Sequence, residues 1–186
     1  MINSRNLNHL NPKLNIFREF AIVIAIVFLL SCGGWAMINS KDDFFHMVKT
    51  LTEQRPFDPR KIEELTARNL EKIQSESNEY FLVYKSVEEK NRYNDVISIE
   101  LRVPTSKSSC EDGILIFELE PETCIDQNDI IGKYGLGEPS PPDPNMPREI
   151  ALFYLSYTYD WGQLSYGFKV IGQECLSSVV LDATKQ

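Results

Sequence analysis

The chain has very little histidine. His9 and His46 are the only two in 186 residues, and neither lies in the C-terminal half of the chain. Hydrolysis by a Ser–His or Cys–His pair needs an imidazole within hydrogen-bonding distance of the nucleophile. Zinc sites built on imidazole have the same requirement. The scarcity of histidine therefore argues against both classes of site.

Signals for metals and cofactors are also missing. Three of the four cysteines lie beyond residue 100, and none of them forms a Cys-x-x-Cys pair. The segment Gly132–Gly137 contains a Gly-x-Gly, but Ser140 stands where a dinucleotide-binding fingerprint needs its third glycine. We expect neither a metal nor a cofactor.

Clusters of basic residues are absent after residue 40. The chain carries a net charge of −8, and residues 1–39 hold three basic side chains against one acidic, which leaves 16 basic and 26 acidic residues in the remainder. Binding to nucleic acid requires clustered Lys and Arg. The composition therefore argues against a nucleic-acid partner. The acidic excess either serves ordinary solubility or steers a protein partner that is itself basic.

One long apolar run is present. Residues 20–38 contain no charged side chain, and at about 1.5 Å per residue a helix of this length nearly spans a hydrocarbon core of about 30 Å. Arg5, Lys13 and Arg18 precede the run, so the positive-inside rule predicts that residues 1–19 form a cytoplasmic tail. Residues 40–186 would then form an exported domain, on the periplasmic side in a Gram-negative cell.

A second type of anchor remains open. Leu29-Leu30-Ser31-Cys32 resembles the lipobox of bacterial lipoproteins. The resemblance implies cleavage before Cys32 and a diacylglycerol on its thiol, with residues 1–19 as the signal n-region and the apolar run as the h-region. The two anchors differ in whether residues 1–31 are retained.

Export makes cysteine pairing expected, because oxidising compartments favour disulfides. Cys110 and Cys124 flank a predicted strand of about 20 Å, whereas bonded cysteines have Cα atoms about 4.4 to 6.8 Å apart. We therefore predict a disulfide between Cys124 and Cys175.

The exported part reads as an α+β domain with one or two helices packed on a mainly antiparallel sheet. Apolar spacing predicts a helix over 44–54 and a second that Asp58 caps and that runs to about Gln74. Alternating apolar residues then predict a sheet. Its expected strands cover 80–84, 96–103, 114–119, 150–159, 163–171 and 176–181. Glycines and prolines predict a loop over 132–147.

The favoured function is non-catalytic binding of another protein. Aromatic side chains near the predicted hairpin and a stiff proline loop are typical of interfaces. The candidate binding residues are Tyr157, Tyr159, Trp161, Tyr166, Pro141 and Pro142. An immunity protein and an accessory subunit of a bacterial envelope complex are both compatible with an anchored domain of this kind.

The alternative is a carboxylate-dependent enzyme that acts on envelope glycans. Glu118, Glu120 and Asp126 fall in one short stretch, and paired carboxylates catalyse glycoside hydrolysis. A calcium loop starting at Asp126 is not expected, because Ile130 replaces an oxygen ligand and Gly132 comes one place late. A concave site that holds two of these carboxylates would favour the enzyme.

Overall fold

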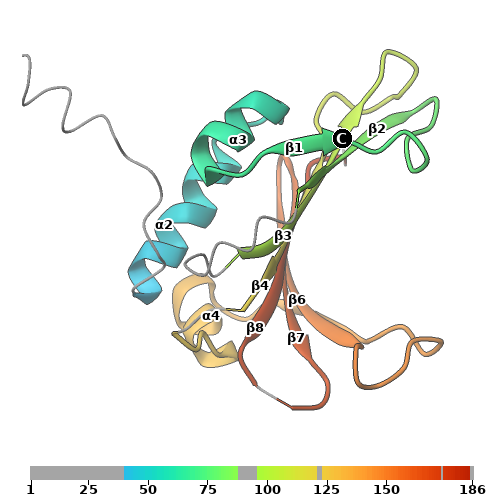
Figure 1. The fold of residues 1–186 in the computed structure, drawn as a ribbon. Helices are drawn as coiled ribbons and strands as arrows, with labels where there is room; N and C mark the ends of the chain where they lie inside the picture. The colour runs from blue at the N-terminus through green and yellow to red at the C-terminus, as the bar shows by residue number, and fades with distance from the viewer. Residues whose placement is uncertain (1–39, 88–95, 121–122, 173, 185–186) are drawn as a thin grey trace, which may run out of the picture. The chain divides into compact units, whose positions relative to one another are not determined.

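The computed structural model describes residues 40–87, 96–120, 123–172 and 174–184. The described part contains three helices and eight strands (Figure 1). The helices are α2 (Lys41–Thr52), α3 (Pro59–Thr66) and α4 (Gln127–Tyr134). The strands are β1 (Leu70–Lys72), β2 (Phe81–Ser86), β3 (Val96–Pro104), β4 (Ile114–Leu119), β5 (Glu138–Ser140), β6 (Leu152–Tyr159), β7 (Gly162–Lys169) and β8 (Leu176–Asp182).

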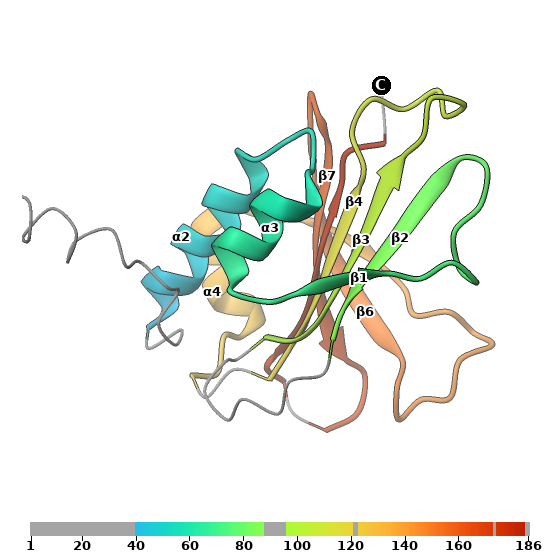
Figure 2. The same cartoon turned by 45° about the horizontal axis from the view of Figure 1, so that its top comes forward.

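The strands form a single antiparallel sheet in the order β1-β2-β3-β4-β8-β7-β6-β5. Strands β1 to β4 are each paired with the next in sequence, and so are β5 to β8. The two four-stranded halves are joined through β4 and β8, with Leu115 opposite Leu181. All three helices lie on one side of this sheet (Figure 2). The α+β, mainly antiparallel architecture predicted from the sequence is thus confirmed, but the described residues form three helices rather than the one or two expected.

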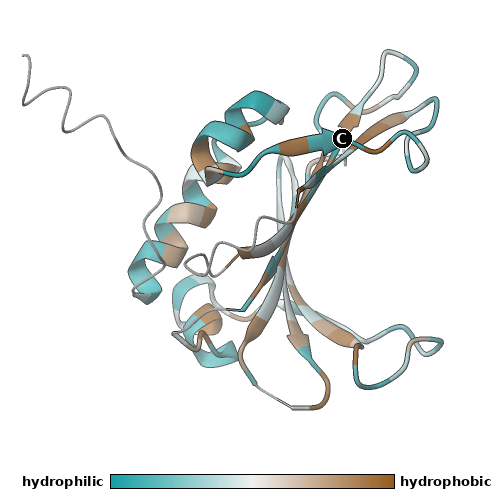
Figure 3. Cartoon of the chain, viewed as in Figure 1, coloured by the Kyte–Doolittle hydropathy of each residue, from teal (hydrophilic) through white to brown (hydrophobic). Residues whose placement is uncertain are grey.

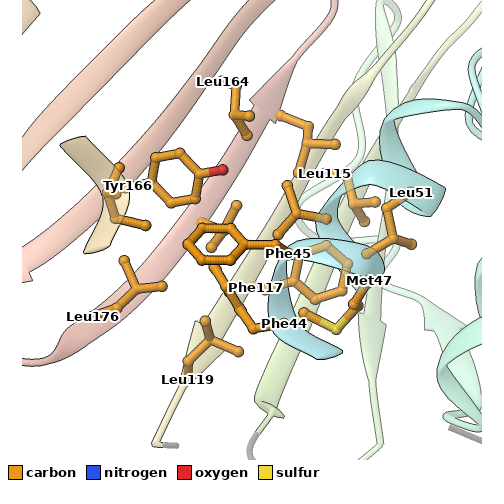
Figure 4. Close-up of a cluster of buried hydrophobic side chains, with 14 of the residues drawn as sticks. Phe44, Phe45, Met47, Leu51, Leu115, Phe117, Leu119, Leu164, Tyr166 and Leu176 are labelled. Atoms are coloured by element: carbon orange, nitrogen blue, oxygen red, sulfur yellow. The ribbon is translucent and has the colours of Figure 1, made fainter. Parts of the chain in front are cut away.

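Helix α2 supplies much of the core. Ser40 caps it, accepting a hydrogen bond from the backbone N–H of Asp43 at 3.1 Å. Its buried side chains recur at helical spacing and pack on the inward residues of β4, β7 and β8 (Figure 4). They are Phe44, Phe45, Met47, Val48 and Leu51. Figure 3 shows the apolar side of the helix turned toward the sheet.

The second helix is shorter than the sequence predicts. Asp58 caps it as expected, but it ends at Thr66 rather than near Gln74, because Ala67 adopts a left-handed conformation with φ of 51°. Leu70, which continued the apolar stripe of the predicted helix, instead lies in β1 opposite Ser86 of β2. The apolar spacing continues from α3 into β1, so the sequence predicted one long helix where the structure has a helix and a strand.

The segment 132–147 is not a continuous loop. Residues 132–134 are the last turn of α4, whose N-terminus carries a capping box between Asp126 and Asp129. Strand β5 follows and includes Pro139 opposite Leu155. A proline is tolerated there because β5 is an edge strand, which needs hydrogen bonds on one side only.

The disulfide between Cys124 and Cys175 is present, with the two Cα atoms 5.1 Å apart. It joins the segment before α4 to the start of β8. Cys110 is free and partly buried.

The predicted anchor, residues 20–38 with the lipidation candidate Cys32, lies outside the described residues. Within the part of the chain that the structure describes, no helix has the length and apolar character needed to cross a membrane.

Candidate functional site

The two ends of the sheet carry different surfaces. At one, which we call the hairpin end, β6 turns into β7 with Tyr159 opposite Gly162, and Gln163 lies opposite Asp182 of β8. At the other, the disulfide end, the Cys124–Cys175 bridge precedes the first residues of β8.

At the hairpin end, two of the predicted binding residues form a stack. The rings of Tyr159 and Trp161 lie 5.3 Å apart between centroids and within 6° of parallel. The guanidinium of Arg55 lies 4.3 Å from the centroid of the Trp161 ring, which is cation–π geometry. Arg55 is itself fixed by a 2.7 Å hydrogen bond from its Nε to the Thr52 carbonyl and by an ion pair with Asp112 at 4.0 Å. Arg55 therefore connects the aromatic stack to the end of α2 and to Asp112.

Two hollows adjoin this stack. The smaller, of about 130 Å³, is lined by Val48, Lys49, Thr52, Tyr134, Tyr159, Trp161 and Leu164. The larger, of about 380 Å³, is lined by Tyr134, Leu136, Glu138, Ser156, Tyr157, Thr158 and Tyr159. Tyr134 and Tyr159 line both. We call Arg55, Tyr134, Leu136, Tyr159 and Trp161 together the aromatic surface.

Tyr134, which belongs to the aromatic surface, packs against two other tyrosines. Tyr134 packs against Tyr157 and against Tyr166, each pair with ring centroids 5.4 Å apart. The Tyr157 hydroxyl donates a hydrogen bond to the Gly135 carbonyl at 2.9 Å. Burial raises the pKa of Tyr134, Tyr157 and Tyr159 above the usual value of 10.0, so these hydroxyls stay neutral at physiological pH. They can exchange hydrogen bonds with a ligand but carry no charge.

Tyr166 has a different environment from the other tyrosines. Its side chain is fully buried, and Phe44 of α2 covers it with the ring centroids 6.2 Å apart. Its hydroxyl has no partner at ordinary hydrogen-bond geometry among the described residues, but an interaction with the Tyr134 hydroxyl adds to the strong upward shift that burial causes in the Tyr166 pKa. Tyr166 is therefore a core residue and offers no surface to a partner.

The predicted binding residues are thus divided among three places. Tyr159 and Trp161 stack at the hairpin end, and Tyr157, which is mostly buried, lines the larger hollow together with Tyr159. Pro141 and Pro142 follow β5, whose last residue pairs with Tyr154. That position is five residues from Tyr159, or about 17 Å along β6 toward the disulfide end.

Sequence reasoning missed Arg55, Tyr134 and Leu136. Arg55 follows the first predicted helix, and no spacing in the sequence relates it to Trp161. Tyr134 and Leu136 fell in the segment predicted to be a loop. A signal for the helix that carries Tyr134 existed, because Asp126 and Asp129 have the spacing of a capping box.

The candidate acid and base groups of the alternative enzyme do not lie in the two hollows beside the aromatic surface. Glu118 and Glu120 are exposed, and Glu118 accepts a 2.8 Å hydrogen bond from the Ser98 hydroxyl on the adjacent strand. Asp126 caps α4. None of the three lines either hollow beside the aromatic surface. Among the described residues no group of three or more His, Cys, Asp or Glu side chains has metal-binding geometry.

No protein-family model matches the chain, and no curated protein or solved structure is significantly similar to it. The function is therefore inferred from the geometry of the domain and from the sequence.

Proposed function

We propose that residues 40–186 form a non-catalytic protein-binding domain on the extracytoplasmic side of a membrane. Residues 20–38 anchor it, either as an uncleaved span or as the signal segment that precedes acylation of Cys32. An immunity protein and an accessory subunit of a bacterial envelope complex are the two biological roles that fit such a domain. The aromatic surface is the part that contacts the partner.

The observation that carries this proposal is the stack of Tyr159 on Trp161 beside two hollows. Tyr159 keeps 38% of its surface exposed, and Leu136 keeps 89%. Tyrosine, tryptophan and arginine are the residues that most often dominate the energy of protein interfaces. Here all three occur within one small area, next to concave surface that a partner side chain can fill.

The aromatic surface is also organised before a partner arrives. The cation–π contact and the ion pair of Arg55 hold Trp161, and Trp161 holds Tyr159. Side chains that are already ordered lose less conformational entropy on binding, so more of the contact energy remains as affinity. The excess of acidic residues in the exported part adds a preference for a basic partner.

The test is affinity purification of the full-length chain from solubilised membranes, comparing two variants with wild type. Trp161→Ala removes the centre of the aromatic surface and should weaken binding by about 2 kcal/mol, or about thirtyfold. Tyr80→Ala is the matched control. Tyr80 is also an exposed aromatic residue, half of it accessible, but it precedes β2 and so lies on the other half of the sheet.

A partner that co-purifies at near-stoichiometric yield with wild type and Tyr80→Ala, and is lost with Trp161→Ala, supports the proposal. A partner that both variants retain equally shows that the aromatic surface is not the interface. Recovery of no partner across growth conditions rules out the accessory-subunit role. Protection of cells from an exported toxin, lost on Trp161→Ala, would then be the measurement for the immunity role.

A further inference from the structure

Exposed apolar side chains gather at the disulfide end. Ile150 is 62% exposed, Ile171 is 51% and Val170 is 41%. They come from the segment before β6 and the connection from β7 to β8. The backbone N–H of Val170 donates to the Ala151 carbonyl at 3.0 Å, which brings these two segments together. We call Ile150, Val170 and Ile171 the apolar rim.

Helix α2 begins at this same end. Lys41 in its first turn forms an ion pair of 2.6 Å with Asp129 in the first turn of α4. The residue before the α4 cap, Ile125, accepts a 2.8 Å hydrogen bond from the backbone N–H of Leu176 at the start of β8. The residues just after α2 instead contact Trp161 and Asp112 at the hairpin end, through Arg55. Figure 1 and Figure 2 both show α2 rising from the side on which β7 connects to β8.

The length of chain before α2 limits how far this end can lie from the apolar run. Only Asn39 and Ser40 separate residue 38 from Lys41, the first helical residue. The three steps of extended chain from residue 38 to residue 41 reach at most about 11 Å. If residues 20–38 span a membrane, the start of α2 is therefore held at its surface.

We infer that the disulfide end of the domain rests on the membrane and that the side chains of the apolar rim enter the lipid interface. This inference rests on the uncleaved span, one of the two anchors in the proposed function. It accounts for branched apolar side chains that are exposed together at the end where the chain leaves the bilayer, since large exposed apolar patches mark interaction sites. It also places the aromatic surface at the far end of β6, whose eight residues span about 26 Å, where a soluble partner can reach it.

The contact is apolar rather than electrostatic. The charged residues nearest to the apolar rim in the sequence are Arg148, Glu149, Lys169 and Glu174, which sum to no net charge, and Lys41 at the same end is paired with Asp129. Attraction to anionic lipid requires a cluster of basic residues. The apolar rim should therefore contact zwitterionic lipid as readily as anionic lipid.

The experiment uses the full-length chain reconstituted in phosphatidylcholine vesicles. A photoreactive benzophenone amino acid replaces Ile171 in one sample, Ile150 in a second and Leu136 in a third. Leu136 is the matched control, because it is a more exposed apolar residue that lies at the hairpin end. After irradiation, mass spectrometry measures the phospholipid attached to the protein, and flotation measures whether the protein is membrane-bound.

We expect several-fold more phospholipid adduct at positions 150 and 171 than at position 136, with all three samples floating with the vesicles. A chain that floats but labels equally at all three positions, or only at 136, overturns the inference and leaves the anchor intact. A chain that does not float overturns the anchor and the inference together. Addition of anionic lipid should leave the labelling ratio unchanged, and a ratio that depends on it would contradict the apolar contact.

Discussion

Replacing both Cys124 and Cys175 by serine should lower the free energy of unfolding by about 4 kcal/mol. The two cysteines are 51 residues apart in the sequence, and the loop they close contains α4 and strands β5, β6 and β7. Without the bridge, the unfolded chain gains the conformational freedom of that loop. The chain-entropy relation gives about 14 cal/mol/K for a loop of this length, which is about 4 kcal/mol at 25 °C.

The folded structure should survive the substitution. Ile125 and Leu176 lie next to the two cysteines and are almost fully buried, and the hydrogen bond between their backbones does not depend on the bridge. The free energy of unfolding of a domain of this size is about 5 to 15 kcal/mol. A loss of about 4 kcal/mol therefore leaves most of the molecules folded. The effect is therefore measurable as a shift in stability.

Urea denaturation of the full-length chain in mild detergent, followed by circular dichroism, measures this loss. With a denaturant dependence of about 2 kcal/mol per molar, the midpoint should fall by about 2 M. Cys110→Ser is the control and should change stability by less than about 0.5 kcal/mol, since Cys110 is free. A double variant within about 1 kcal/mol of wild type would refute the loop argument, as would an equal effect of the control.

Three further predictions concern single groups. Tyr166→Phe should raise the free energy of unfolding by about 1 kcal/mol in thermal denaturation, because the removed hydroxyl is buried with no partner at ordinary hydrogen-bond geometry; a comparable fall would show that its interaction with Tyr134 is a hydrogen bond. Gly162→Ala should lower the free energy of unfolding by more than about 2 kcal/mol, since φ is +143° there and a Cβ would collide with a backbone carbonyl of β8. Gly132→Ala, on the open side of α4, should raise the free energy of unfolding. Burial alone would raise the pKa of Asp129, but hydrogen bonds from Lys41 and from the backbone N–H of the capping residue hold it below 3.8. That stabilisation is present above pH 3.8 and disappears as pH falls through the lowered pKa, so hydrogen exchange in the first turn of α4 should rise only below that pH; a rise near pH 6 would contradict the assignment.

The strands could be predicted closely because their side chains alternate. The predicted strand 114–119 matches β4, and the hairpin around residue 161 is confirmed by the pairing of Tyr159 with Gly162. Alternation reports directly on which residues face the core of a half-buried sheet. The element boundaries that were wrong involve Ala67 and Pro139, where a local backbone conformation or an edge position overrode the pattern.

The candidate site was predictable only in part. Tyr159 and Trp161 are neighbours in the sequence, so a shared surface followed from the turn between them. Tyr166 could not be separated from them by composition, because its burial depends on Phe44 of α2, more than a hundred residues away in the chain. The contact of Arg55 with Trp161 could not be predicted either, because the two residues are also more than a hundred positions apart in the chain.

The order of the strands has a consequence for how the protein is made. Strand β8 is the last to be synthesised, yet it lies in the middle of the sheet, between β4 and β7. Until it emerges, the ribosome has released two partial sheets, each with an inner strand lacking its neighbour, and exposed strand edges of this kind promote aggregation. The sheet can close only after β8 has been synthesised, so the two halves stay unjoined until then. A nonsense mutation just before β8 would leave two halves of a sheet with no strand between them.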